Sequence, residues 1–224
     1  MDNKALKSSL KDVYRRLYHT YGQQHWWPAE GPFEVIIGAI LTQSAAWPNV
    51  EKAILNLKKA GALTPGALRR ISLNKLARLV YPSGYYNVKA RKLKAFVEWL
   101  GEKHDDSLDS LFKPGIPELR ESLLGIYGIG EETADSIILY AGNKPIFVID
   151  AYTRRIFDRL GSLPPERTYN SYQKMFMDFL PADAALFNEY HALLVKLGKE
   201  ACRKNPLCST CCLKTRCAEF KKNR

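Results

Sequence analysis

Hydrophobic residues recur at intervals of three and four along most of the chain, which is the period of an amphipathic α-helix. The first such stripe comprises Leu6, Leu10, Val13, Leu17 and Tyr21, and further stripes lie at 50–57, 93–100, 156–160, 175–179 and 187–197. Glycine and proline separate the stripes, so the connections are short. The only run typical of a strand is 146–149. We therefore predict an all-α protein of about ten helices.

The composition is that of a globular protein with an excess of positive charge. With 46% hydrophobic and 25% charged residues among 224, the chain is neither collagenous, mucin-like nor wholly disordered. The net charge of +11 suggests a polyanionic partner, such as nucleic acid or an acidic membrane surface. Most of this excess lies in residues 196–224, where nine Lys and Arg face two Glu.

The cysteines share the same terminal stretch, at Cys202, Cys208, Cys211, Cys212 and Cys217. The chain starts MDNKALKSSL, without an apolar signal core, and has no apolar run of the roughly 18 residues that span a membrane. We therefore expect a cytoplasmic protein with no membrane association. In a reducing compartment, clustered thiols are metal ligands first and disulfides second.

A glycine-rich turn separates two helical patterns in the segment 123–135, which reads LLGIYGIGEETAD. Its glycines permit close backbone approach, and the amides at the start of the next helix would face an anion. We expect Gly128, Ile129, Gly130 and Thr133 to grip a DNA phosphate without reading base sequence. Acidic residues outnumber basic ones around this turn, so backbone dipoles would supply the attraction. The alternative is a tight helical hairpin without a ligand.

Asp150 lies between the apolar run 146–149 and a new helical pattern, where the simplest role of an aspartate is an N-cap. Together with the glycine turn, however, this segment resembles the helix-hairpin-helix (HhH-GPD) DNA glycosylases of the endonuclease III superfamily. The resemblance covers essentially the whole chain and implies a two-lobed helical fold. Residues 33–144 would form a six-helix barrel domain with the hairpin at about 120–140. Residues 1–32 and 145–224 would form a second helical domain.

The resemblance also implies roles for single residues. Asp150 would be catalytic, stabilising the oxocarbenium-like sugar and orienting the attacking water. Gln43, in the segment LTQS, would fill the space that a flipped nucleotide leaves, and Tyr85, in GYYNVKA, would wedge into the duplex. The partner would be double-stranded DNA with a damaged base. The protein would be a monomer associated with a prokaryotic nucleoid.

The terminal cysteines resemble the iron–sulfur loop of endonuclease III. That family has the pattern C-x6-C-x2-C-x5-C, whereas Cys202, Cys208, Cys211 and Cys217 give C-x5-C-x2-C-x5-C. The resemblance implies that these four thiolates hold a [4Fe–4S] cluster in the loop 202–217. Cys212 is an additional thiol that could replace Cys211 as a ligand, and a tetrahedral zinc site is the alternative to the cluster.

Two further features narrow the expected reaction. Glu132 occupies the position of the lysine that forms the Schiff base in bifunctional endonuclease III. A carboxylate cannot form an imine, so we expect a monofunctional glycosylase with weak or absent AP-lyase activity. The pattern WWP, then LTQ, then GIGxE[ST]AD is most similar to 3-methyladenine DNA glycosylase III. The expected substrate pocket comprises Trp26, Trp27, Pro28, Trp47 and Glu132.

Physical chemistry favours the same substrate. An alkylated purine of the 3-methyladenine type is cationic, so indole faces and carboxylates would stabilise it. One alternative is an endonuclease III-like or mismatch glycosylase that acts on uracil, thymine or oxidised pyrimidines, which are neutral. A second is a non-catalytic DNA-binding or damage-sensing module.

Overall fold

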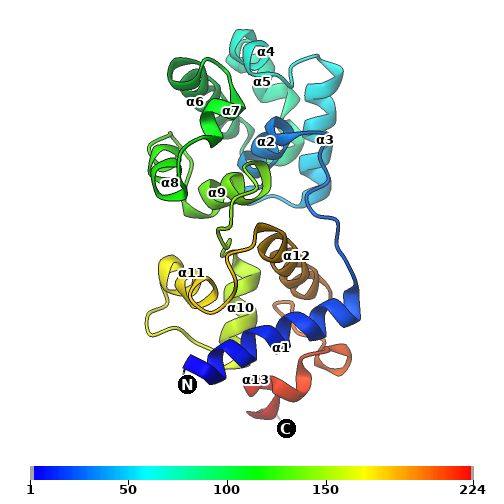
Figure 1. Ribbon diagram of the computed structural model, residues 1–224. Coiled ribbons are helices and arrows are strands. Elements are labelled where there is room, and N and C mark those ends of the chain that lie inside the picture. The colour runs from blue at the N-terminus through cyan, green and yellow to red at the C-terminus, as the bar shows by residue number, and fades with distance from the viewer. Residues whose placement is uncertain (1–2, 223–224) are drawn as a thin grey trace. The chain divides into compact units, whose positions relative to one another are not determined.

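The computed structural model describes residues 3–222, and these residues form helices and connecting segments without a β-strand (Figure 1). The chain divides into two compact units. One is the continuous segment Trp27–Lys144, which we call the central unit. The other, the terminal unit, combines Met1–Trp26 with Pro145–Arg224. The sequence prediction put the first of these boundaries at residue 33.

The central unit is built around α2, whose residues 34–41 are all buried. Both α3 and α6 pack against α2, and α6 also packs against α4 and α5. Its elements are α2 (Pro32–Thr42), α3 (Trp47–Lys59), α4 (Pro65–Arg70), α5 (Leu73–Leu79), the short 3-10 helix η1 (Tyr81–Ser83), α6 (Tyr86–His104), α7 (Leu108–Phe112), α8 (Ile116–Leu124), α9 (Glu131–Ser136) and a π-helical turn, η2 (Ile137–Ala141).

The terminal unit is built around α12, which packs against α1 and α10. Its elements are α1 (Asn3–Tyr21), α10 (Ala151–Leu160), α11 (Tyr169–Met177), α12 (Ala184–Glu200), the 3-10 helices η3 (Cys208–Thr210) and η4 (Lys214–Arg216), and α13 (Ala218–Lys222). Phe147 stacks on Phe176 with ring centroids 3.9 Å apart, and the buried Tyr190 donates from its hydroxyl to the Leu10 carbonyl at 2.9 Å. Aromatic packing therefore forms much of this core.

The all-α prediction is confirmed, and the run 146–149 forms no strand. The segment is buried and has no regular secondary structure, and side chains hydrogen-bond parts of its backbone. The Phe147 carbonyl accepts a hydrogen bond from Gln173 Nε2 at 2.7 Å, and the Ile149 amide donates to the Tyr169 hydroxyl at 3.3 Å. A short apolar run therefore indicates burial without indicating a partner strand.

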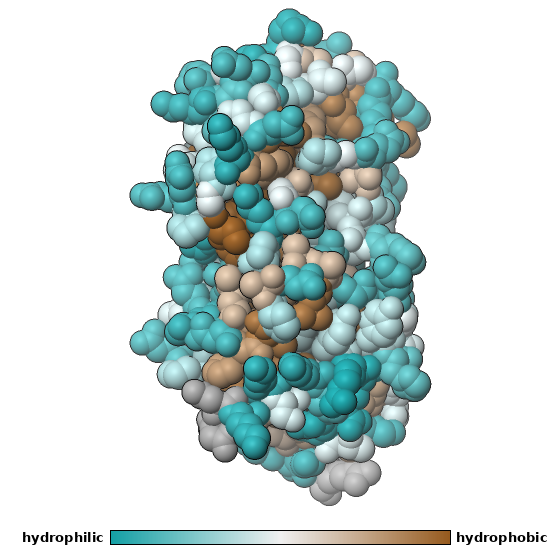
Figure 2. Space-filling view, viewed as in Figure 1, coloured by the Kyte–Doolittle hydropathy of each residue, from teal (hydrophilic) through white to brown (hydrophobic). Residues whose placement is uncertain are grey.

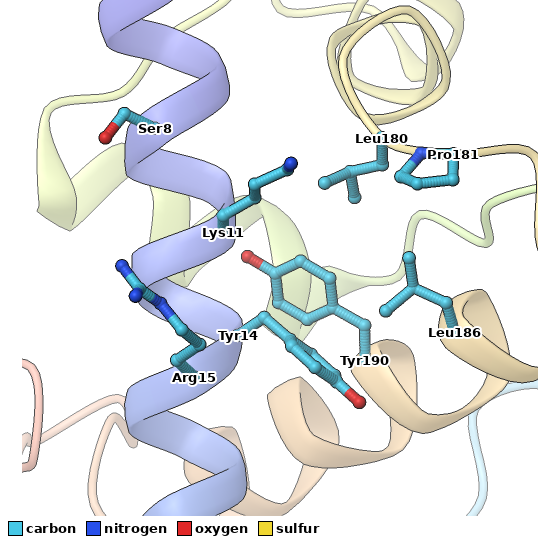
Figure 3. Close-up of a pocket in the computed structure, with 8 residues that line it drawn as sticks. All are labelled: Ser8, Lys11, Tyr14, Arg15, Leu180, Pro181, Leu186 and Tyr190. Atoms are coloured by element: carbon cyan, nitrogen blue, oxygen red, sulfur yellow. The ribbon is translucent and has the colours of Figure 1, made fainter.

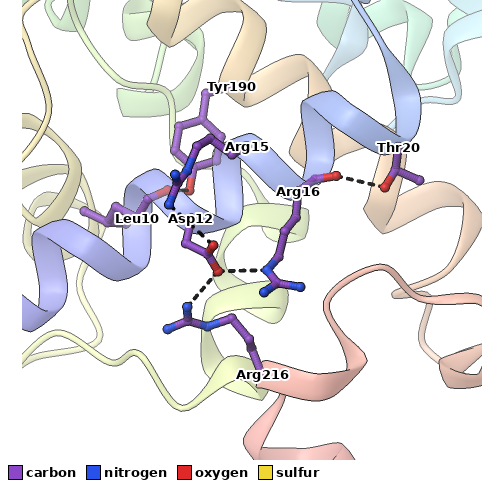
Figure 4. A network of polar contacts seen from close by, with 7 residues as sticks. All are labelled: Leu10, Asp12, Arg15, Arg16, Thr20, Tyr190 and Arg216. Atoms are coloured by element: carbon purple, nitrogen blue, oxygen red, sulfur yellow. Dashed lines mark hydrogen bonds and ion pairs between the residues drawn. The ribbon is translucent and has the colours of Figure 1, made fainter.

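Asp12 connects α1 to the C-terminal loop of the terminal unit (Figure 4). Its carboxylate accepts hydrogen bonds from Arg16 at 2.8 Å and from Arg216, in η4, at 2.6 Å. Burial acts to raise the pKa of Asp12, but the hydrogen bonds from the two arginines outweigh it and hold the pKa below 3.8. The first helix thus fixes one end of the cysteine-bearing loop.

The surface is mostly polar. Figure 2 shows hydrophilic side chains over most of the visible face, with smaller hydrophobic patches between them. No helix among residues 3–222 combines the length and the apolar character needed to cross a bilayer.

Lys89 is a charged side chain inside the central unit, with 2% of its surface exposed. Its Nζ donates to the Leu41 carbonyl at 2.8 Å and to the Ser83 carbonyl at 2.5 Å. Burial, with a smaller contribution from the charge of Lys92, lowers the pKa of Lys89 from 10.5 to about 8. This one ammonium therefore joins the C-terminal end of α2 to η1.

Replacing Lys89 by Met should destabilise the protein, because two buried carbonyls would lose their donor. We expect the free energy of unfolding in urea to fall by about 1 to 3 kcal/mol. Lys52→Met, at an exposed position on α3, is the matched control and should change it by less than about 0.5 kcal/mol. Equal stability of the two variants would contradict this account of Lys89.

Candidate functional site

The structure forms a helical hairpin at the glycine-rich turn, with α8 before it and α9 after it. Gly128 has φ +81°, a conformation that a residue with a side chain rarely adopts. The Ile129 amide donates to the Ile126 carbonyl at 3.1 Å, and both side chains are buried. Gly130 is the N-cap of α9. The turn is therefore anchored by its isoleucines.

A buried ion pair fixes the two helices of the hairpin. Arg120 Nε, on α8, lies 2.7 Å from the carboxylate of Asp135, on α9, whose side chain is fully buried. Arg120 also lies 3.5 Å from Glu131. Glu131 and the exposed Glu132 occupy the first turn of α9, where carboxylates complement the helix dipole. The carboxylate of Glu132 thus stabilises the start of α9, in addition to the functional role that the sequence predicts for it.

Gln43 lies against the hairpin. Its Nε2 donates to the Gly128 carbonyl at 3.0 Å and to Thr133 Oγ1 at 2.9 Å, while its Oε1 accepts from Lys92 Nζ. The structure thus brings together three of the predicted DNA-contacting residues, Gln43, Gly128 and Thr133. Sequence analysis missed Lys92, which lies on α6 one turn after Lys89.

Tyr85, the predicted wedge, immediately precedes α6 and is 73% exposed. Its φ of +46° places a bulky residue in the left-handed region. Such a conformation is unfavourable for a bulky residue. Tyr81 and Tyr86 flank it with ring centroids 4.9 Å apart. The structure therefore presents an exposed aromatic ring on a strained turn.

Two of the predicted pocket tryptophans pack together in the central unit. The rings of Trp27 and Trp47 meet edge to face, with centroids 5.2 Å apart and an interplanar angle of 87°. Trp27 also packs against Tyr140 at 5.2 Å, and a Cβ at Gly38 would lie 3.1 Å from Trp27. Sequence analysis missed Tyr140, which lies in the π-helical turn η2. Of the other predicted pocket residues, Pro28 is exposed and Trp26 belongs to the terminal unit.

Asp150 is the N-cap of α10 and is 8% exposed. Its Oδ1 accepts a hydrogen bond from the Thr153 amide at 2.7 Å, and its Oδ2 lies 3.7 Å from His191 Nε2. Burial lowers the pKa of His191 below 6.5, and the charge of Asp150 only partly opposes this. His191, on α12, is therefore uncharged at neutral pH. Sequence analysis missed it because nothing local relates it to Asp150.

Two arginines of α10 hold the start of the cysteine loop. Arg155 donates to the carbonyls of Cys202 and Gly198 at 2.9 and 3.1 Å. Arg159 lies 3.5 Å from Cys202 Sγ through Nη1 and donates to the Arg203 carbonyl at 2.6 Å. The thiol of Cys217 donates to the carbonyl of Arg159 at 3.2 Å. Cys202 and Cys217, the first and last predicted ligands, thus both contact Arg159.

The remaining thiols lie in the same loop and are partly buried. Burial is the main reason that the pKa of Cys211 is raised to about 11. A hydrogen bond with the backbone of Leu213 partly opposes this effect, and the nearby thiols of Cys212, Cys202 and Cys217 add to it. Burial also raises the pKa of Cys212, against a hydrogen bond from Thr20. Among the residues that the structure describes, no three His, Cys, Asp or Glu are arranged to hold a single metal ion. Binding of a metal centre by Cys211 would therefore require its thiol to lose a proton.

A separate pocket of about 390 Å³ lies in the terminal unit, between α1 and α12 (Figure 3). Leu180, Leu186 and Tyr190 form apolar walls, and Lys11 and Arg15 project from α1 beside them. None of the residues predicted to act on DNA lines this pocket.

The buried, uncharged His191 should make stability depend on pH. Its pKa is lower in the folded chain than in the unfolded one, so the unfolded chain binds the additional proton. The free energy of unfolding should therefore fall as the pH drops below about 6.5, with a slope of at most about 1.4 kcal/mol per pH unit from this group.

Urea unfolding of His191→Gln between pH 7 and pH 5 should show a shallower slope than the wild type. His19→Gln, at an exposed position on α1, is the control and should keep the wild-type slope. A slope in His191→Gln as steep as in the wild type would show that another group is responsible.

This chain is similar to a family of DNA repair proteins. Residues 37–182 match the family described as the HhH-GPD superfamily base excision DNA repair protein. A protein of Methanocaldococcus jannaschii, described as a "putative DNA repair glycosylase", is 42% identical over 92% of this chain and 94% of its own length.

Solved structures show the same fold. The crystal structure of the H. pylori 3-methyladenine DNA glycosylase bound to 1,N6-ethenoadenine is 27% identical, with a TM-score of 0.73 over 89% of this chain and 98% of that one. A trapped endonuclease III–DNA covalent intermediate is 22% identical, with a TM-score of 0.83 over 97% and 98%. This chain, with its helical hairpin and its aspartate that caps α10, belongs to the HhH-GPD superfamily of base excision DNA repair proteins.

Proposed function

We propose that this DNA glycosylase of the endonuclease III superfamily removes alkylated purines of the 3-methyladenine type from double-stranded DNA, and that it leaves an abasic site. The observation that carries the proposal is the cluster of Trp27, Trp47 and Tyr140 in the central unit. An N-alkylated purine is cationic, and the face of an electron-rich ring attracts a cation by about 0.5 to 2 kcal/mol. The similarity to the H. pylori enzyme supports the same substrate class.

Asp150 would carry the chemistry. As the N-glycosidic bond breaks, its electron pair leaves with the base, which departs neutral because it was cationic. The carboxylate of Asp150 stabilises the positive charge that develops on the sugar. The bond from the Thr153 amide holds Oδ1 in place, which leaves Oδ2 to orient a water molecule toward the sugar carbon. No general acid is needed for such a leaving group.

Glu132 supports hydrolysis without strand cleavage. A β-elimination needs an amine that forms an imine with the opened sugar, and the side chain at this position is an exposed carboxylate. The reaction would therefore end at the abasic site, and the acidic side chain would add to the field that favours a cationic base.

DNA would be held by the hairpin and by two residues that enter the duplex. Gly128, Ile129, Gly130 and Thr133 would contact a phosphate, Gln43 would fill the vacated space, and Tyr85 would wedge between bases. The contact of Gln43 with the hairpin supports this division of roles, since it ties the residue that enters the duplex to the turn that grips the backbone. The similarity to an endonuclease III captured with DNA agrees with duplex DNA as the partner.

The cysteine loop would hold a [4Fe–4S] cluster through Cys202, Cys208, Cys211 and Cys217. The contacts of Cys202 and Cys217 with Arg159, and the partly buried positions of Cys208 and Cys211 in the same loop, support these ligands. The four cysteines would bind the cluster as thiolates after releasing their protons to solvent, and they would then hold the basic loop in one conformation.

Release of bases from alkylated DNA tests the proposed substrate. Wild-type protein should release 3-methyladenine from methylated duplex DNA, and Asp150→Asn should release it at least about 100-fold more slowly, because the stabilising charge is lost. The variant should still bind duplex DNA, since an Asn side-chain oxygen also caps a helix.

Uracil opposite guanine and an oxidised pyrimidine are the matched neutral substrates for the same assay. Excision of these bases without 3-methyladenine would assign the protein to the alternative branch. No release from any substrate would favour a damage-sensing module. Borohydride should trap no covalent DNA complex with the pure wild-type protein, and efficient trapping would contradict the monofunctional reaction.

The ligand set can be tested on purified protein by its visible absorbance and its iron content. Cys211→Ser should lose the cluster, because three thiolates hold it far less well than four. Cys212→Ser, which changes the adjacent thiol, is the matched control and should retain both signals. The reverse result would make Cys212 the ligand, and retention by both variants would contradict the proposed set.

A further inference from the structure

Three partners surround the side-chain amide of Gln43 and fix which way it faces. The ammonium of Lys92 can only donate, so it must face Oε1. The carbonyl of Gly128 can only accept, so it must face Nε2, which also donates to Thr133 Oγ1. Both N–H groups and one lone pair of the amide are therefore in use within the central unit.

Lys92 reaches this position by packing along the hairpin turn. A Cβ at Gly128 would lie only 2.4 Å from Lys92 Cγ and 2.6 Å from Cδ and Cε, so the lysine stem lies where a side chain at residue 128 would be. The glycine therefore serves a second purpose besides its positive φ. Lys92 is half-buried, and its ammonium ends at Gln43 instead of extending into solvent.

The same helix also fixes the backbone next to Gln43. Lys89, one turn before Lys92 on α6, holds the Leu41 carbonyl two residues before Gln43. The backbone entering Gln43 and the amide at its tip are thus both held by ammonium groups from one face of α6. A Gln side chain otherwise loses up to about 2 kcal/mol of rotational entropy when it is fixed.

We propose that Lys92 is a positioning residue that locks the Gln43 side chain to the hairpin, so that the residue entering the duplex and the turn gripping its backbone engage DNA as one rigid element. This inference rests on the proposed DNA contacts of Gln43. Lys92 would affect DNA binding by orienting Gln43, and not by attracting the DNA through its charge alone. Loss of the ammonium removes one of the three hydrogen bonds that orient the amide, and entry of Gln43 into DNA then becomes less favourable.

Fluorescence of a 2-aminopurine placed opposite a tetrahydrofuran abasic analogue tests this inference without base excision. Wild-type protein should change the fluorescence as Gln43 enters the gap, and Gln43→Ala should abolish the change. Lys92→Met should weaken the apparent affinity measured by this signal about 5- to 10-fold, and Lys92→Arg, which keeps a cationic donor, should restore most of it. Arg91→Met removes a neighbouring charge and should cost less than about 2-fold.

A double-mutant cycle separates positioning from simple charge attraction. In the Gln43→Ala background, Lys92→Met should reduce affinity for the same duplex, measured by anisotropy, by less than about 2-fold. An equal loss in both backgrounds would overturn the inference, as would an unchanged or stronger 2-aminopurine signal in Lys92→Met. Urea unfolding of each variant would show whether a loss reflects misfolding, and Lys92→Arg then decides the outcome.

The two proposals can fail separately. If the wild type gives no 2-aminopurine signal, Gln43 does not enter DNA and this inference is overturned, whereas the proposed substrate is decided by base release alone. If the signal and the cycle behave as expected but no alkylated base is released, the substrate proposal alone is wrong.

Discussion

A buried ammonium determines the geometry of the central unit. Lys89 lies in the first turn of α6, and its two carbonyl partners belong to Leu41 and Ser83. Leu41 lies two residues before Gln43, and Ser83 lies two residues before Tyr85. We propose that Gln43 and Tyr85 enter the DNA duplex. The lowered pKa, about 8, shows that burial disfavours the charged form of this amine. An apolar side chain would avoid that cost but would not hold two carbonyls at a fixed separation.

In the terminal unit, the corresponding constraint is the position of Asp150. The segment before it is buried and has no regular secondary structure. Side chains of α11 hydrogen-bond its backbone, Gln173 to the Phe147 carbonyl and Tyr169 to the Ile149 amide. Asp150 therefore enters α10 at a point determined by the core. Its two oxygens then have different surroundings, with Oδ1 bonded to the backbone and Oδ2 near the uncharged His191. Capping and the proposed chemistry are compatible in one carboxylate because they would use different atoms.

The sequence was informative wherever the signal is local. Apolar periodicity predicts α1, α6 and α12, and the glycines predict the hairpin turn. Sequence periodicity did not reveal the short helices α4, α5 and α7, because five to seven residues contain too few apolar positions to show a helical period. The run 146–149 has the apolar pattern of a strand but forms none, because burial of a short apolar segment does not require a strand partner.

The residues that sequence analysis missed in the site act through long-range contacts. Lys92 meets Gln43 across 49 positions, and Tyr140 meets Trp27 from a π-helical turn. His191 is a lone histidine on an otherwise apolar helix face until the fold brings it to Asp150. Motifs identify residues that a chemistry needs, whereas the residues that orient them have no fixed spacing and become visible only in three dimensions.

The backbone at Tyr85 is less favourable for stability than glycine would be, and the proposed contact with DNA is a reason to keep the tyrosine. A left-handed residue with a side chain is less stable than glycine by roughly 1 kcal/mol, and an exposed ring recovers little of that by packing. Selection for thermal stability alone would therefore replace this tyrosine with glycine. A stabilised variant obtained in that way would keep its fold, yet would lack the ring that we propose wedges between bases.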